Sequence, residues 1–170
     1  MAGEGTTMVP VTISAAIINR EALREGFGLR DDPGAEGTGA GHRVRRRADH
    51  FIKLTENGGE RALHIGVGVA EAVALGLTQS GRELHRPMTY QFAASLLTGS
   101  GTGLREVRIT RLTDGVFYAE AVLTNGAIVD ARPSDAVNLA AITGAPVLVA
   151  AELLDLPTGP ARDSNPEPAD

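Results

Sequence analysis

The stretch ARPSDAVNLAAITGAPVLVA, residues 131–150, decides the fold class because it reads as a strand end, a helix and a second strand. A residue that precedes a proline favours extended backbone, so Arg132 is predicted to end the first strand. Helix-compatible residues fill 134–143, and Gly144 then supplies the stop. Small and β-branched residues at 146–150 predict the strand that follows.

A meander of strands is predicted directly before this stretch. The dipeptides Asp114-Gly115 and Asn125-Gly126 supply the positive φ angles that tight hairpin turns need. The strands that they separate are predicted at 104–112, 116–124 and 127–132.

The first half of the chain repeats the theme of strands followed by helices. Alternating apolar residues predict a strand at 8–19. Two more strands are predicted at 50–55 and 61–67, joined by a hairpin turn at Asn57-Gly58-Gly59. The segment 69–78 is apolar on every side and predicts a buried helix.

A second helix is predicted at 87–97. We expect Thr89 to cap its start, Gly99 to end it, and Phe92, Leu96 and Leu97 to face the core.

Hairpins interrupted by helices predict the α+β class. We expect a single compact domain with a mostly antiparallel or mixed sheet and about three helices packed on it. The domain is predicted to span 8–156, after a flexible N-terminus at 1–7. A Gly-rich insertion loop is expected at 31–41, and a disordered tail with four prolines at 157–170.

Composition limits the classes of function. The 170 residues are 42% hydrophobic and 22% charged, which is typical of a globular domain. The absence of cysteine excludes disulfides, thiolate zinc sites and cysteine nucleophiles. The N-terminal residues show neither a signal-peptide pattern nor a membrane span, so we expect a cytoplasmic protein with no membrane partner.

A net charge of −5 argues against binding nucleic acid through the whole surface. A local patch is still available in the basic run Arg43, Arg45, Arg46 and Arg47. Its alternative interpretation is a solvated face with no ligand.

The richest polar cluster lies where the predicted strand 127–132 meets the next helix. Asp130 and Arg132 share one face of the strand, and Asp135 and Asn138 share one face of the helix. Ser134 is predicted to cap the helix. These side chains form either a site or an ion pair that joins helix to strand.

Three further residues are candidates. Glu71 lies early in an apolar helix, and an unpaired buried carboxylate is costly, so it needs a metal, the helix N-terminus or a partner such as Arg132. His85 and Arg86 precede the second helix and are candidate ligands of a substrate or plain loop residues. The four histidines of the chain show no metal-ligand spacing.

Three blocks of this sequence resemble the bifunctional nuclease (DUF151) domain family. VGVAEAVALGL at 67–77 is similar to the I-G-x-x-E-A block, and RPMTYQFAASLL at 86–97 is similar to R-P-x-T-H-D-L. The longest block runs from Asp114 to Ala119, matching D-G-x-F-Y-A, and from Ala131 to Pro146, matching A-R-P-S-D-A-x-x-L-A-x-x-x-x-A-P. The resemblance covers about residues 51–155.

The resemblance implies hydrolysis of phosphodiester bonds in RNA or DNA and a chain that forms homo-oligomers. From the chemistry of the residues, we expect Glu71, Arg132 and Asp135 to take catalytic roles, and Arg86, Asp130, Asn138 and His85 to bind substrate. A divalent cation held by carboxylates is a candidate cofactor. The chain departs from the family pattern at Tyr90-Gln91, where family members carry His-Asp. The alternative is therefore a catalytically weakened binding or regulatory module, or a structural oligomer-forming domain, on the same scaffold.

Overall fold

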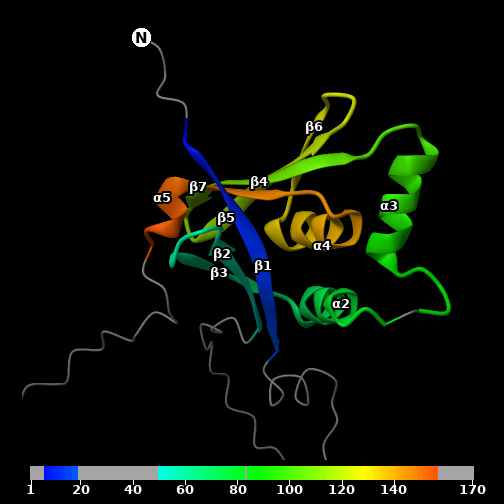
Figure 1. The fold of residues 1–170 in the computed structure, drawn as a ribbon, viewed down its shortest axis with the longest axis horizontal. Coiled ribbons are helices and arrows are strands. Elements are labelled where there is room, and N and C mark those ends of the chain that lie inside the picture. The colour runs from blue at the N-terminus through cyan, green and yellow to red at the C-terminus, as the bar shows by residue number, and fades with distance from the viewer. Residues whose placement is uncertain (1–5, 19–49, 83, 157–170) are drawn as a thin grey trace, which may run out of the picture.

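The computed structural model describes residues 6–18, 50–82 and 84–156, and all the strands in this part of the chain belong to one curled sheet (Figure 1). The strands are β1 (Met8–Ile18), β2 (His50–Glu56), β3 (Ala62–Val67), β4 (Leu104–Thr113), β5 (Val116–Leu123), β6 (Ile128–Ala131) and β7 (Val147–Ala150). Their order is β3-β2-β1-β7-β4-β5-β6, and every neighbouring pair is antiparallel except β4 and β7. The predicted α+β class with a mixed sheet is confirmed.

The described residues also form three helices of 11 residues and one short helix. They are α2 (Val69–Gln79), α3 (Thr89–Gly99), α4 (Pro133–Thr143) and α5 (Ala151–Leu154). Figure 1 shows α4 within the curl of the sheet, α2 beside it, and α3 outside both. The three long helices were predicted, and α5 was not.

Strand β7 explains how one sheet holds both halves of the chain. Its residues pair with β1 on one side and with β4 on the other. Val147 and Val149 are buried at this central position, where both neighbours are present. The stretch 131–150 therefore places α4 against the sheet and then joins the two hairpin units.

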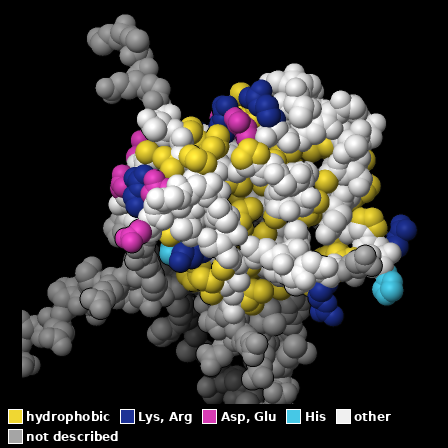
Figure 2. Space-filling view, viewed as in Figure 1, with side chains coloured by type: hydrophobic (Ala, Val, Ile, Leu, Met, Phe, Trp, Pro, Cys, Tyr) yellow, Lys and Arg dark blue, Asp and Glu magenta, His cyan; other side chains and the backbone are white. Residues whose placement is uncertain are grey.

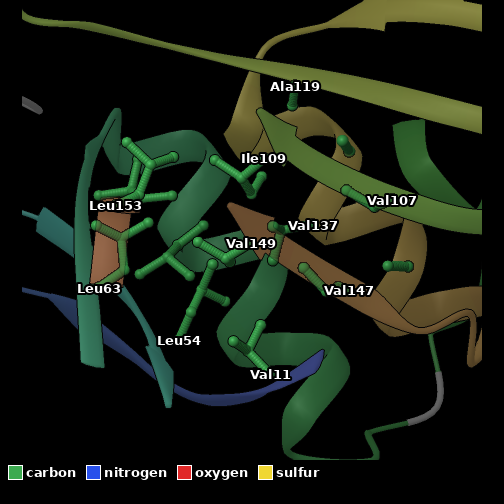
Figure 3. Close-up of a cluster of buried hydrophobic side chains, with 14 of the residues drawn as sticks. Val11, Leu54, Leu63, Val107, Ile109, Ala119, Val137, Val147, Val149 and Leu153 are labelled. Atoms are coloured by element: carbon green, nitrogen blue, oxygen red, sulfur yellow. The ribbon is translucent and has the colours of Figure 1, made fainter. Parts of the chain in front are cut away.

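The core forms between the concave face of the sheet and α4. Val137 of α4 lies among strand residues such as Leu54, Ile109 and Val149 (Figure 3). All four side chains are fully buried. Aliphatic packing, with few aromatic rings, thus fixes α4, and with it the polar residues at the start of α4.

Two predictions about helix burial are wrong. In α2 only Ala72 and Leu75 are buried, because this helix packs on β1 and α4 along one side. In α3 Phe92 and Leu96 are exposed rather than core-facing, because α3 packs mainly against α4 at the outside of the fold. Leu97 is half-buried and packs against the core as expected.

The predicted helix caps are also wrong. Met88 rather than Thr89 occupies the N-cap of α3, and no side chain caps that helix. Arg132 occupies the N-cap of α4, with Pro133 in the first turn, so the buried Ser134 is already helical. A proline suits this position because its missing N–H has no intrahelical partner to lose. The predicted ends hold, since α3 ends at Gly99 and Gly144 has φ 74° after α4.

Several predictions lie outside the described residues. They concern residues 1–5, the loop at 31–41, the arginine run at 43–47 and the tail at 157–170. Within the described ranges, no helix is long and apolar enough to cross a membrane.

Candidate functional site

Arg132 lies at the point where β6 passes into α4. Its backbone is extended, with φ −68° and ψ 142°, as the following proline requires. Its carbonyl oxygen accepts hydrogen bonds from the backbone N–H groups of Asp135 and Ala136, both at 3.1 Å. The local sequence therefore fixes the main chain from which the guanidinium extends.

The guanidinium of Arg132 joins two carboxylates from different helices. Its Nε and Nη2 donate to Oδ2 and Oδ1 of Asp135 at 2.6 and 2.9 Å, a bidentate pair within α4. The same Nη2 donates to Oε1 of Glu71 in α2 at 2.9 Å. Glu71 and Asp135, 64 positions apart in sequence, are thus held on one cation.

Part of the Arg132 guanidinium remains available for another ligand. Its side chain is 66% exposed. Among the described residues none accepts a hydrogen bond from Nη1, because the pairs with Glu71 and Asp135 use only Nε and Nη2. Arginine N–H groups commonly bind phosphate oxygens, and the two N–H groups of Nη1 remain for that purpose.

Glu71 reaches Arg132 because of the residue before its helix. Glu71 lies in the first turn of α2, and Gly68 occupies the N-cap. A Cβ added at Gly68 would overlap Oε2 of Glu71, so this glycine leaves space for the carboxylate. The Glu71 side chain is only 16% exposed, and burying a carboxylate costs free energy. Its ion pair with Arg132 offsets that cost.

Tyr90 is the fourth member of the cluster and comes from a third helix, α3. It lies in the first turn of α3, and its hydroxyl donates to Oδ1 of Asp135 at 2.8 Å. Burial and the neighbouring Asp135 carboxylate raise the pKa of the Tyr90 phenol, so the hydroxyl stays protonated. Hydrogen bonding from Arg132 holds the pKa of Asp135 below its usual range, and Tyr90 acts in the same direction.

These side chains border an open cleft of about 300 Å³ between α2, the start of α3 and the start of α4. Its lining residues are Ala70, Glu71, Ala74, Met88, Thr89, Tyr90, Arg132 and Asp135. The ionised groups here are two carboxylates and one guanidinium, which leaves one formal negative charge. Glu71, Arg132 and Asp135 therefore converge in a cleft that is open to solvent.

Asn138 belongs to the support of this cluster rather than to its open surface. It is fully buried, and its Nδ2 donates to the backbone oxygens of Glu71 and Ser134 at 3.1 and 2.9 Å. The predicted contact of Asn138 with substrate does not fit this position. Its side chain instead ties α2 to α4 and so fixes the distance between Glu71 and Arg132.

The other predicted ligands lie apart from the cluster. Asp130 is exposed on β6 opposite Glu120, and no hydrogen bond or ion pair among the described residues joins it to Arg132. It therefore does not cluster with Arg132 as expected, since the chain turns into α4 after Ala131. His85 and Arg86 are exposed on the segment that leads to α3, outside the residues that line the cleft.

Tyr90 is the residue that sequence reasoning missed as a member of the cluster. Sequence showed only that it replaces a histidine, whereas the structure gives it a hydrogen bond to Asp135. The fixed spacing of the block 86–97 was the available signal, because it placed this position at the start of a helix. Within the described ranges no group of three or more His, Cys, Asp or Glu residues is arranged to hold a metal ion.

Comparison with known proteins identifies relatives of this chain. The profile of a family described as the bifunctional nuclease domain matches residues 52–158. Uncharacterized proteins from two strains of Mycobacterium tuberculosis, CDC 1551 and H37Rv, are each 41% identical over 98 residues. That alignment covers 58% of this chain and 60% of each relative.

Proposed function

Because the chain belongs to the bifunctional nuclease domain family, we propose that it hydrolyses phosphodiester bonds in RNA or DNA at the cleft around Arg132. The observation that carries this proposal is the partly unused guanidinium. Arg132 is bound by Glu71 and Asp135, its side chain is 66% exposed, and Nη1 has no hydrogen-bond partner among the described residues. A preorganised donor of this kind stabilises the charge that develops on a phosphate oxygen.

The carboxylates take distinct roles in this proposal. Glu71 accepts the proton of the attacking water, whose oxygen forms a bond to phosphorus as the bond to the leaving sugar oxygen breaks. The leaving oxygen takes a proton from solvent water, since the cleft is open. Asp135 accepts hydrogen bonds from Arg132 and Tyr90, so it positions those two groups. Exposed Arg86 and His85, on the segment leading to the cleft, would contact the backbone of a longer strand.

Where a divalent cation assists cleavage, Glu71 and Asp135 would hold it together with phosphate oxygens, because within the described ranges no three His, Cys, Asp or Glu residues are arranged to hold one alone. Magnesium is commonly held by one or two carboxylates together with phosphate oxygens, and Glu71 and Asp135 are the carboxylates that line the cleft. Such a cation would neutralise phosphate charge and lower the pKa of a bound water.

A second function, binding without cleavage, is favoured by Tyr90. The phenol stands where family members carry histidine, and its raised pKa removes it as a base at neutral pH. A cleft with this residue can still bind a phosphodiester through Arg132. The alternative is therefore a binding or regulatory module on the nuclease scaffold.

A nuclease assay on the purified full chain tests the first proposal. We expect cleavage of single-stranded RNA or DNA, with loss of rate in EDTA and in Asp135→Ala. Glu152→Gln, which changes an exposed carboxylate in α5 outside the cleft, is the control for loss of one negative charge. Unchanged cleavage by Asp135→Ala would remove Asp135 from the mechanism.

The variant Tyr90→His separates the two functions. General acid–base catalysis contributes roughly 10²- to 10⁴-fold to rate. A gain of that order with histidine, from a wild type that binds but scarcely cleaves, would support the binding module. An equal or lower rate would show that the phenol suits this active site.

We also propose that the chain acts in the cytoplasm, since a sequence without cysteine suits a reducing compartment.

We further propose that two copies of the chain associate through α3. Met88, Phe92 and Leu96 are spaced by four residues along one side of this helix, and all three are exposed. Figure 2 shows the surface over α3 with apolar and uncharged side chains. A twofold interface sets each patch against its own copy, so an uncharged patch avoids repulsion between like charges.

A further inference from the structure

A second cleft opens on the other side of Arg132. Its volume is about 590 Å³, within the range of roughly 300–1,000 Å³ that is typical of small-molecule sites. Arg132 lines it together with residues of the β3–α2 junction, the start of β5 and the start of α4. Arg132 is the residue that this second cleft shares with the cleft of Glu71 and Tyr90.

The curl of the sheet creates this cleft. Strand β3 is one end of the strand order, and β5 is next to the other end, yet both contribute to the same walls. The start of α4 closes the gap between them with Pro133 and Ser134. The second cleft is therefore the seam where the curled sheet approaches itself.

The walls of the seam suit an uncharged group. Apart from Arg132, no lining side chain carries a charge. One wall includes Gly66, Val67 and Gly68, and another includes the half-buried Phe117. Aromatic side chains stack on the flat faces of nucleobases, and Phe117 is the aromatic residue that lines this cleft.

We propose that this second cleft binds the nucleobase adjoining the phosphodiester that Arg132 holds. The proposal rests on the proposed function in that it assumes a phosphodiester at Arg132. The nucleoside on one side of that phosphate then lies near Glu71 and Tyr90. The base of the nucleoside on the other side enters the seam beside Phe117. The second cleft thus makes the preferred ligand a nucleotide rather than any phosphodiester.

Binding to the full chain tests the proposal without requiring turnover. The probes are phosphorothioate-linked thymidine dinucleotide and the same compound with hydrogen in place of both bases, each titrated by calorimetry. Stacking one base on an aromatic side chain contributes enough to tighten binding by on the order of tenfold. We therefore expect the dinucleotide to bind about tenfold more tightly than its base-free analogue.

Phe117→Leu removes the aromatic face while keeping an apolar side chain in the half-buried position. It should abolish most of the preference for the dinucleotide and leave binding of the base-free analogue unchanged. Tyr118→Leu is the matched control, since neighbouring strand residues face opposite sides and Tyr118 stacks with Arg111 at 3.9 Å. A thermal melt of each variant verifies that it is folded.

The outcomes separate this inference from the nuclease proposal. Equal affinity for both probes, or equal effects of Phe117→Leu and Tyr118→Leu, would overturn the nucleobase site even if the chain cleaves RNA or DNA. A preference that depends on Phe117 in a chain that cleaves neither would support the nucleobase site and reject the nuclease activity.

Discussion

At the scale of single residues, the guanidinium of Arg132 organises the candidate site. It binds the half-exposed Asp135 through two hydrogen bonds and the mostly buried Glu71 through one. Burial of each carboxylate would cost more free energy without the guanidinium. The Arg132 side chain would be less ordered without the two carboxylates. The three residues therefore act as a unit, and changes at two of them should not be additive.

The lowered pKa of Asp135 predicts how stability depends on pH. The folded protein binds the Asp135 proton more weakly than the unfolded chain, whose aspartate pKa is about 3.9. The resulting stabilisation is present above that value and is lost as pH falls through the lower folded pKa. Asp135→Asn should thus lower the free energy of unfolding by about 0.5–1 kcal/mol at pH 7, and by less at pH 3.

Urea denaturation at the two pH values measures this difference, with Glu152→Gln as the charge-matched control. A penalty for Asp135→Asn that stays constant or grows toward pH 3 would contradict the assigned ion pair.

Gly68→Ala tests whether the position of Glu71 matters. The backbone of Gly68, with φ −70° and ψ 159°, is accessible to alanine, so the fold should be kept. The new methyl group would displace the Glu71 carboxylate from Arg132, and misplacement by about 1 Å can cost on the order of 10²-fold in rate. Nuclease rate and melting temperature are measured together.

Gly103→Ala is the matched control, because its methyl group would meet only Thr124 at an ordinary 3.6 Å. Full activity of Gly68→Ala would show that Glu71 need not contact Arg132.

At the scale of elements, sequence predicted the helices better than the faces that they bury. Glycines, prolines and turn dipeptides act locally, so the limits of α4 and the hairpin at Asp114-Gly115 were predictable. The outward direction of Phe92 depends on which elements surround α3, and apolar spacing alone carries no such information. Likewise, Arg132 and Asp135 are near in sequence and could be paired, whereas the bond from Tyr90 depends on how α3 packs on α4.

Asn138→Ala tests the joint between α2 and α4. The change removes both hydrogen bonds of Nδ2 and leaves the backbone oxygen of Glu71 without this donor. A lost buried hydrogen bond costs about 1–3 kcal/mol, which should appear in the urea unfolding of the variant. Gln79→Ala removes an exposed bond to the backbone oxygen of Ile13 and should cost under about 0.5 kcal/mol. Equal penalties would show that Asn138 is not a joint.

At the scale of the whole molecule, the curl of the sheet and the placement of α3 jointly define the surface. The curl brings β3 and β5 to either side of the α4 start, where the two clefts meet at Arg132. Helix α3 borders the first cleft through Met88 and Tyr90 and presents Phe92 and Leu96 outward. Association through α3 would therefore cover apolar surface next to the cleft.

Phe92→Glu tests that association. Phe92 is 57% exposed, so the monomer should tolerate the charge, whereas a twofold interface would bring two new carboxylates together. An interface hot spot contributes about 2 kcal/mol or more, which corresponds to a dimer weakened by roughly 30-fold. Ile128→Glu, at 58% exposure on β6, makes the same charge change away from α3. Sedimentation equilibrium should show a dimer for the wild type and for Ile128→Glu, and a monomer for Phe92→Glu. A monomeric wild type, or the same association state for both variants, would reject the α3 interface.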